Sequence, residues 1–115
     1  MQAKVLYLES NNHLSWEEFE NYTPVDPFDA YGWFHVTVGA GETDGGNDFQ
    51  ICVATPKAVG PAQHAGSVSG LIIGRFDAGT IKAALTEKIS SIQGHTWEEI
   101  VDQLRTFMHW EYEGM

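Results

Sequence analysis

The period of the hydrophobic pattern changes once along this chain, near residue 77, and no other feature constrains the fold as strongly. Before that point apolar residues alternate with polar ones, as at Val36 and Val38, which is the pattern of a half-buried β-strand. After it they recur at helical spacing, as at Ile81 and Leu85. Strands first and helices last predict an α+β fold.

Four stretches are predicted as strands, because each is rich in β-branched or aromatic residues. They span residues 4–9, 31–40, 48–55 and 70–76. The glycine-rich loop between the second and third strands predicts an antiparallel hairpin. Pro56 ends the third strand, because proline has no N–H for the ladder. The small and polar residues at 58–69 predict a surface excursion.

Two helices follow. Asp77 is placed to cap the first, and Gly94 is expected to end it. Thr96 and Glu99 have the spacing of a capping box at the start of the second. The residues at 109–113 either extend that helix or add a short edge strand. The predicted α+β domain spans residues 1–115, with an antiparallel sheet of about four strands and two C-terminal helices packed on one face.

The charge of the chain limits the partners it can have. Its 16 acidic and 6 basic residues give a formal net charge of -10, which repels the phosphates of nucleic acids and the anionic surface of membranes. A cationic protein would instead be attracted. The same net charge could serve only to keep the protein soluble, so the charge by itself identifies no partner.

The single cysteine indicates the compartment. Cys52 cannot form an internal disulfide, and its apolar neighbours predict a small buried hydrophobe instead of a reactive thiol. The chain starts without the apolar stretch of a signal peptide, and no window is long enough to cross a bilayer. A cytoplasmic location is therefore expected.

No motif for catalysis or cofactor binding is present. The histidines are scattered, no G-x-S-x-G occurs, and the glycines near residue 40 do not open a helix as a phosphate loop would. Carboxylate pairs are abundant, but on so acidic a surface they are ordinarily just solvated. No catalytic residue, cofactor or metal site is predicted, and the chain is interpreted as a binding protein and not an enzyme.

Aromatic residues stand beside acids at both ends of the chain. Ser15 and Glu18 predict one short helical turn, which places large rings among carboxylates. Aromatic anchors with an acidic rim suit an interface with a basic protein, although the same rings could simply pack at the edge of the core. The candidate partner-binding residues are Trp16, Glu17, Glu18, Glu20, Glu42, Asp44, Asp48, Trp110, Glu111, Tyr112 and Glu113.

The alternative is a small enzyme or ligand-binding domain. It would use the sheet face that the helices leave open, because Trp33, His35, Gln50 and Cys52 all alternate away from the apolar rows. A pocket with convergent polar groups would favour this alternative. Self-association through the same face is a third possibility.

Several segments together resemble a known family. They are Gly46-Asn47-Asp48-Phe49-Gln50-Ile51-Cys52-Val53-Ala54-Thr55-Pro56, Leu71-Ile72-Ile73, the helix from Asp77, Thr96-Trp97-Glu98-Glu99 and His109-Trp110-Glu111-Tyr112-Glu113. In order and spacing they resemble the immunity protein 8 family of bacterial polymorphic toxin systems. The resemblance implies a cytoplasmic inhibitor, with no chemistry of its own, that binds a toxin encoded beside it. It does not imply which toxin.

Overall fold

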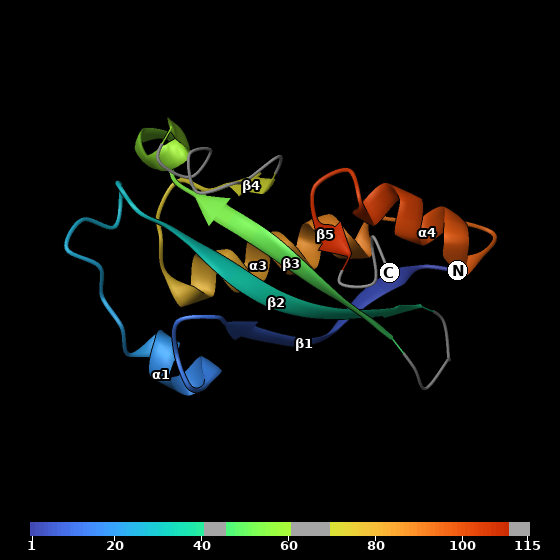
Figure 1. Cartoon of the computed structure of the whole chain (residues 1–115), viewed down its shortest axis with the longest axis horizontal. Coiled ribbons are helices and arrows are strands. Elements are labelled where there is room, and N and C mark those ends of the chain that lie inside the picture. Colours follow the sequence, from blue (N-terminus) through green and yellow to red (C-terminus); the bar gives the residue numbers. More distant parts are fainter. Residues whose placement is uncertain (41–45, 61–69, 111–115) are drawn as a thin grey trace.

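The computed structural model describes residues 1–40, 46–60 and 70–110 (Figure 1). In those ranges a mixed sheet lies against two longer helices, which confirms the α+β class. The elements in order are β1 (Ala3–Ser10), α1 (Trp16–Glu20), β2 (Tyr31–Ala40), β3 (Asn47–Ala54), the 3-10 turn η1 (Pro56–Ala58), β4 (Gly70–Ile72), α3 (Ala78–Ser90), α4 (Trp97–Leu104) and β5 (His109–Trp110).

The central part of the sheet is antiparallel, as predicted. β2 pairs with β1 on one side and with β3 on the other, which confirms the hairpin. β4 and β5 share the far edge of β3, where β5 pairs antiparallel beside Phe49 and Gln50. Of the two structures predicted for residues 109–113, the described residues His109 and Trp110 therefore form the edge strand.

The fourth strand differs from the prediction, because β4 is short and runs parallel to β3. Parallel pairing needs a crossover connection, and the stretch 55–69 is long enough to provide one. Gly70 makes the close approach possible, because a Cβ at this position would overlap the carbonyl oxygen of Cys52.

One face of the sheet and the helices form the core. The apolar rows of β2 and β3 point toward α3 and α4, and all of these side chains belong to one buried cluster. Strand and helical periodicity predicted this set correctly. Its central members are Phe34, Val36, Val38, Phe49, Ile51, Val53, Ile81, Leu85, Ile89, Ile100, Val101 and Leu104.

The three predicted helix caps are confirmed, because each side-chain oxygen accepts a hydrogen bond from a backbone N–H in the first turn. Two of the helices add a second bond, in which the glutamate of the box accepts the N–H of the residue before the cap. The side chain of Ser15 accepts from the N–H of Glu18, that of Asp77 from the N–H of Thr80, and that of Thr96 from the N–H of Glu99.

The end of α3 differs from the prediction, because the helix stops at Ser90 and does not reach Gly94. The hydroxyl of Ser91 donates to a carbonyl of the last turn, and the carbonyl of Ile92 accepts the N–H of Ala3 at 3.0 Å. The chain thus leaves the helix to pair with the N-terminal segment, a long-range contact that helical periodicity does not contain.

Candidate functional site

The sheet face opposite the helices carries a row of polar and aromatic side chains. The register places Trp33 opposite Cys52 and His35 opposite Gln50, so the prediction that these four residues share a face is confirmed. Figure 1 shows this face of β2 and β3 lying in front of α3. We call it the polar sheet face; its members are Tyr7, Glu9, Trp33, His35, Thr37, Asp48, Gln50, Cys52 and His109.

A chain of hydrogen bonds fixes the middle of the polar sheet face. His35 Nε2 lies 3.1 Å from Asp48 Oδ1 and His35 Nδ1 lies 3.3 Å from Gln50 Nε2. Gln50 in turn accepts a bond of 2.6 Å from the amide of Asn11. Because both nitrogens of His35 are engaged, the ring is held in one orientation and presents a fixed pattern of polar groups.

His35 and Asp48 form the kind of pair that serves as an acid–base unit in enzymes. A nucleophile would have to give its proton to His35, but the hydroxyl of Thr37 donates to Asp48 at 2.7 Å. Cys52 is only 3% exposed and packs with Trp33 and neighbouring small residues, as the sequence predicted. The Thr37 hydroxyl also lies 3.4 Å from His35 Nε2, so these described side chains form one hydrogen-bonded network.

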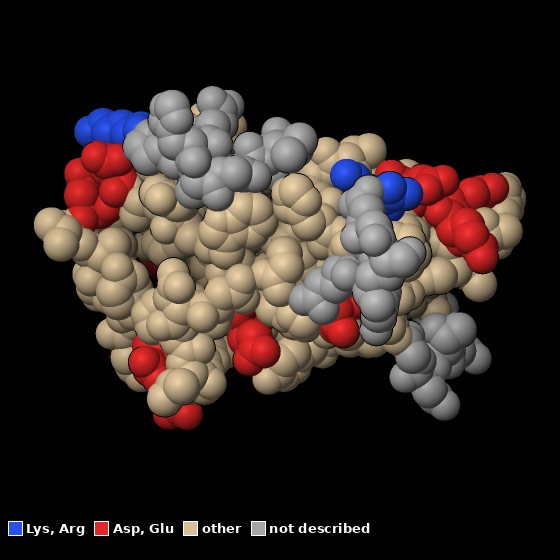
Figure 2. Space-filling model, viewed as in Figure 1, with Lys and Arg blue, Asp and Glu red and all other residues tan. Residues whose placement is uncertain are grey.

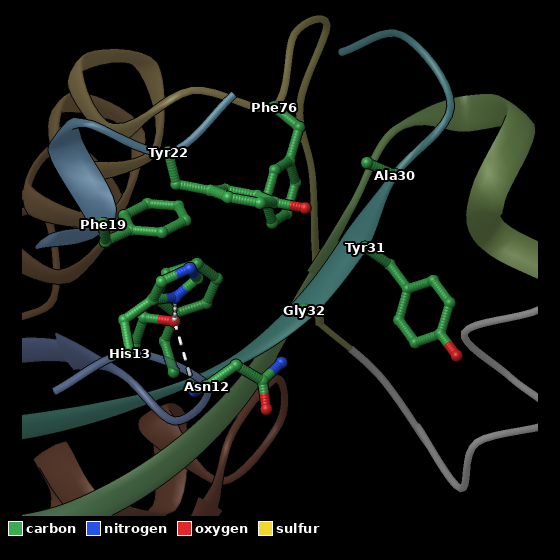
Figure 3. A pocket seen from close by; sticks show the side chains of 10 residues that line it. Asn12, His13, Phe19, Tyr22, Ala30, Tyr31, Gly32 and Phe76 are labelled. Atoms are coloured by element: carbon green, nitrogen blue, oxygen red, sulfur yellow. Dashed lines mark hydrogen bonds between the residues drawn. The ribbon is translucent and has the colours of Figure 1, made fainter. Parts of the chain in front are cut away.

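A separate pocket lies where β1 ends and β2 begins, beneath α1 (Figure 3). Its volume is about 220 Å³. Figure 3 shows the rings of His13, Phe19 and Tyr22 turned toward one another, while the ring of Tyr31 points away. We call it the aromatic pocket; it is lined by Ser10, Asn12, His13, Phe19, Tyr22, Ala30, Tyr31, Gly32, Phe34 and Phe76.

Phe19 anchors the aromatic pocket to the core. Its ring is 2% exposed and meets Phe34 and Phe76 edge-on at 5.2 and 5.9 Å between centroids. His13 lies 5.2 Å from Phe19 and 4.8 Å from Tyr22. The hydroxyl of the buried Ser10 lies 2.9 Å from His13 Nδ1 and holds that ring in place.

The sequence did not predict this pocket, because its lining residues come from several elements that only the folded chain brings together. A signal was nevertheless present. Trp16, Phe19 and Tyr22 recur every third residue, which places them on one side of a short helix and its extension. The partner in space, Phe76, is remote in sequence and could not have been found by spacing.

The described members of the predicted partner-binding set lie on separate elements, α1, β3 and β5. Glu17 and Glu20 are exposed on α1, and Glu18 is exposed while it accepts the N–H of Leu14. Asp48 is the second residue of β3 and lies on the polar sheet face; the start of β3 is at the opposite end of the sheet from α1 (Figure 1). Glu42, Asp44, Glu111, Tyr112 and Glu113 lie outside the described residues.

The two predicted tryptophans are half-buried. The Trp16 ring packs against Phe19 at 5.2 Å, and Trp110 packs against the core beside the guanidinium of Arg105, which lies 6.0 Å from its ring. β5 instead turns His109 onto the polar sheet face, where its ring lies 5.6 Å from that of Trp33. Each ring therefore has a structural role, whether or not a partner also touches it.

Charge on the visible surface is dispersed. In the view of Figure 2, carboxylates are scattered around a mainly uncharged face, and the lysine and arginine groups lie along its upper margin.

Two further properties concern the described ranges only. Residues 1–40, 46–60 and 70–110 contain no helix long and apolar enough to cross a membrane. They also contain no cluster of three or more His, Cys, Asp or Glu side chains suited to hold a metal ion.

Comparison with known proteins identifies the family. No curated protein and no solved structure matches the chain. The family model described as immunity protein 8 matches residues 6–115, nearly the whole sequence, including both the polar sheet face and the aromatic pocket. The resemblance seen in the sequence is thereby confirmed, and the chain belongs to the immunity protein 8 family.

Proposed function

We propose that this chain neutralises a cognate bacterial toxin domain by binding to it in the cytoplasm, and that the toxin surface it contacts is basic. Membership of an immunity protein family over residues 6–115 is the observation that carries the proposal. Inhibition by contact needs no catalytic group, and the described polar sheet face offers polar groups that hydrogen bonds hold in fixed positions.

The acidic surface supports a basic partner. The net charge of -10 raises the rate of encounter with a cationic domain. The exposed carboxylates of α1 and Asp48 on the polar sheet face are proposed to contact the toxin, together with the predicted residues that lie outside the described ranges. Because exposed charges are screened, such contacts change the association rate more than the dissociation rate.

The first experiment tests the function itself. A toxin domain encoded beside this chain is expressed with and without it, and cell survival and complex formation between the purified proteins are measured. We expect survival only with the chain present, and a stable complex. Death of the co-expressing cells, with no complex between the purified proteins, would show that the proposal is wrong.

The second experiment tests the electrostatic part. Association is followed by biolayer interferometry at increasing salt, and we expect the rate to fall roughly tenfold or more. The double variant Glu17→Lys and Glu20→Lys should slow association more than the control Glu87→Lys and Asp102→Lys. The control changes two exposed acids elsewhere and gives the same net charge. Equal rates for the two double variants would remove α1 from the interface.

A further inference from the structure

We infer that β1 pairs edge to edge with β1 of a second copy of this chain, so that two copies form a dimer with one continuous sheet. The inference does not depend on the proposed function, because it rests on the geometry and charge of β1 itself. In the described part of the chain β1 is the outermost strand and pairs only with β2. It forms the lower margin of the sheet in Figure 1.

The free edge of β1 presents backbone groups that can bond to another strand. The N–H of Ala3 points away from β2, because it donates at 3.0 Å to a carbonyl that follows α3, and Val5 points the same way. The N–H of Asn11 donates to a carbonyl of β2, so Leu8 points outward. Within residues 1–40, 46–60 and 70–110, no backbone group bonds to the outward N–H and C=O of Val5 and Leu8. Such groups are a template for strand pairing.

A bulge in β1 determines which strand fits this edge. The register with β2 shifts between Val5 and Tyr7, which leaves Leu6 as an extra residue. The outward positions Val5 and Leu8 are therefore three residues apart, whereas outward positions in a regular strand are two apart. A regular strand matches one of them but not both. The bulged strand of a second copy matches both, because Val5 of each copy then faces Leu8 of the other across a two-fold axis.

The charges of β1 are complementary in the same register. Lys4 and Glu9 flank the core-facing Val5 and Leu8, so both project on the side of the polar sheet face. When Val5 faces Leu8 of the second copy, Lys4 faces Glu9 of that copy, and symmetry repeats this pair. A lysine on an edge strand ordinarily discourages pairing. Its match with Glu9 therefore favours a second copy over an unrelated strand.

Apolar side chains are exposed along the same edge. Leu6 is 43% exposed and Tyr7 is 56% exposed, and the two-fold axis brings Leu6 of each copy close to Tyr7 of the other. A groove of about 460 Å³ lies beside β1, where the second strand would place its core-facing side chains. Burial of these apolar groups favours association. The groove is lined by Val5, Leu6, Tyr7, Leu8, Trp16, Lys82 and Thr86.

The net charge of -10 on each copy opposes dimerisation. At an ionic strength of 0.15 M, however, charges are screened over roughly 8 Å, so groups close to the interface contribute most. β1 contains one base and one acid, and Lys82 of α3 lines the groove. Because one strand forms a small interface, we expect a dissociation constant on the order of 10 to 100 µM.

Sedimentation equilibrium at protein concentrations from about 1 to 500 µM tests the dimer. Lys4→Glu and Glu9→Lys each place like charges opposite one another twice, so each should weaken dimerisation about tenfold. The double variant Lys4→Glu with Glu9→Lys restores opposite charges and should dimerise within about threefold of the wild type. Lys57→Glu is the control, because it changes an exposed lysine in η1 and the net charge equally; it should dimerise as the wild type does.

Amide hydrogen exchange locates the interface. The N–H groups of Val5 and Leu8 should exchange more slowly as the wild-type concentration rises through the dissociation constant. A monomer at about 500 µM would overturn the inference. So would a dimer that both single variants leave intact, single variants that the double variant does not rescue although circular dichroism shows it folded, or protection of these amides only when a toxin domain is added. No toxin is needed for the dimer itself, so these results leave the proposed function untouched.

Discussion

Replacing Phe19 with alanine should destabilise the protein by about 4 kcal/mol, because this one ring joins α1 and the aromatic pocket to the core. Truncating a buried phenylalanine ordinarily costs about 3 to 5 kcal/mol. Phe19 is 2% exposed, so nearly the full transfer term applies. Its edge-on contacts with Phe34 and Phe76 would also be lost, each worth about 0.5 to 1.5 kcal/mol.

The assay is urea denaturation followed by circular dichroism, with the free energy of unfolding compared at constant m-value. Phe19→Leu separates the two contributions, since it keeps most of the apolar volume but no ring; we expect about 1 to 2 kcal/mol. Phe28→Ala is the control, because that ring is 51% exposed and its removal should cost less than about 1 kcal/mol.

The outcome that contradicts this reasoning is a loss below about 1.5 kcal/mol for Phe19→Ala with an unchanged m-value. It would mean that α1 and its ring are not packed onto the sheet in solution. A loss near 4 kcal/mol would take up a large part of the roughly 5 to 15 kcal/mol that stabilises a domain.

Two other predictions concern β4 and α3. Gly70→Ala should destabilise the protein by about 1 to 3 kcal/mol in the same urea assay, because the added Cβ would overlap the Cys52 carbonyl oxygen. Gly74→Ala is the control: a Cβ there meets open space, so the free energy of unfolding should change by less than about 1 kcal/mol. The backbone N–H of Thr80 lowers the pKa of Asp77, so the charged cap stabilises the fold above the ordinary pKa of aspartate and loses this effect as the pH falls through the lowered value. Asp77→Asn should therefore show a shallower loss of thermal stability in acid than the wild type, and an equally steep loss would contradict the assignment.

The sequence alone determined the class of fold and most of its elements. The alternation in β2 and β3 and the helical spacing after Asp77 identified the buried faces. Apolar side chains that face the core recur about every two residues in a strand and every 3.6 residues in a helix. The caps at Asp77 and Thr96 followed from local chemistry. The family could also be identified, because its segments keep their order and spacing along the chain.

Only the tertiary structure decided how distant segments meet. The parallel pairing of β4, the early end of α3 and the edge position of β5 all depend on contacts between residues far apart in sequence, which no local pattern encodes. The polar sheet face was predicted in part, since alternation gave its members but not the hydrogen bonds between them. The aromatic pocket was missed because spacing could suggest the side shared by Trp16, Phe19 and Tyr22, whereas only the folded chain brings Phe76 beside it.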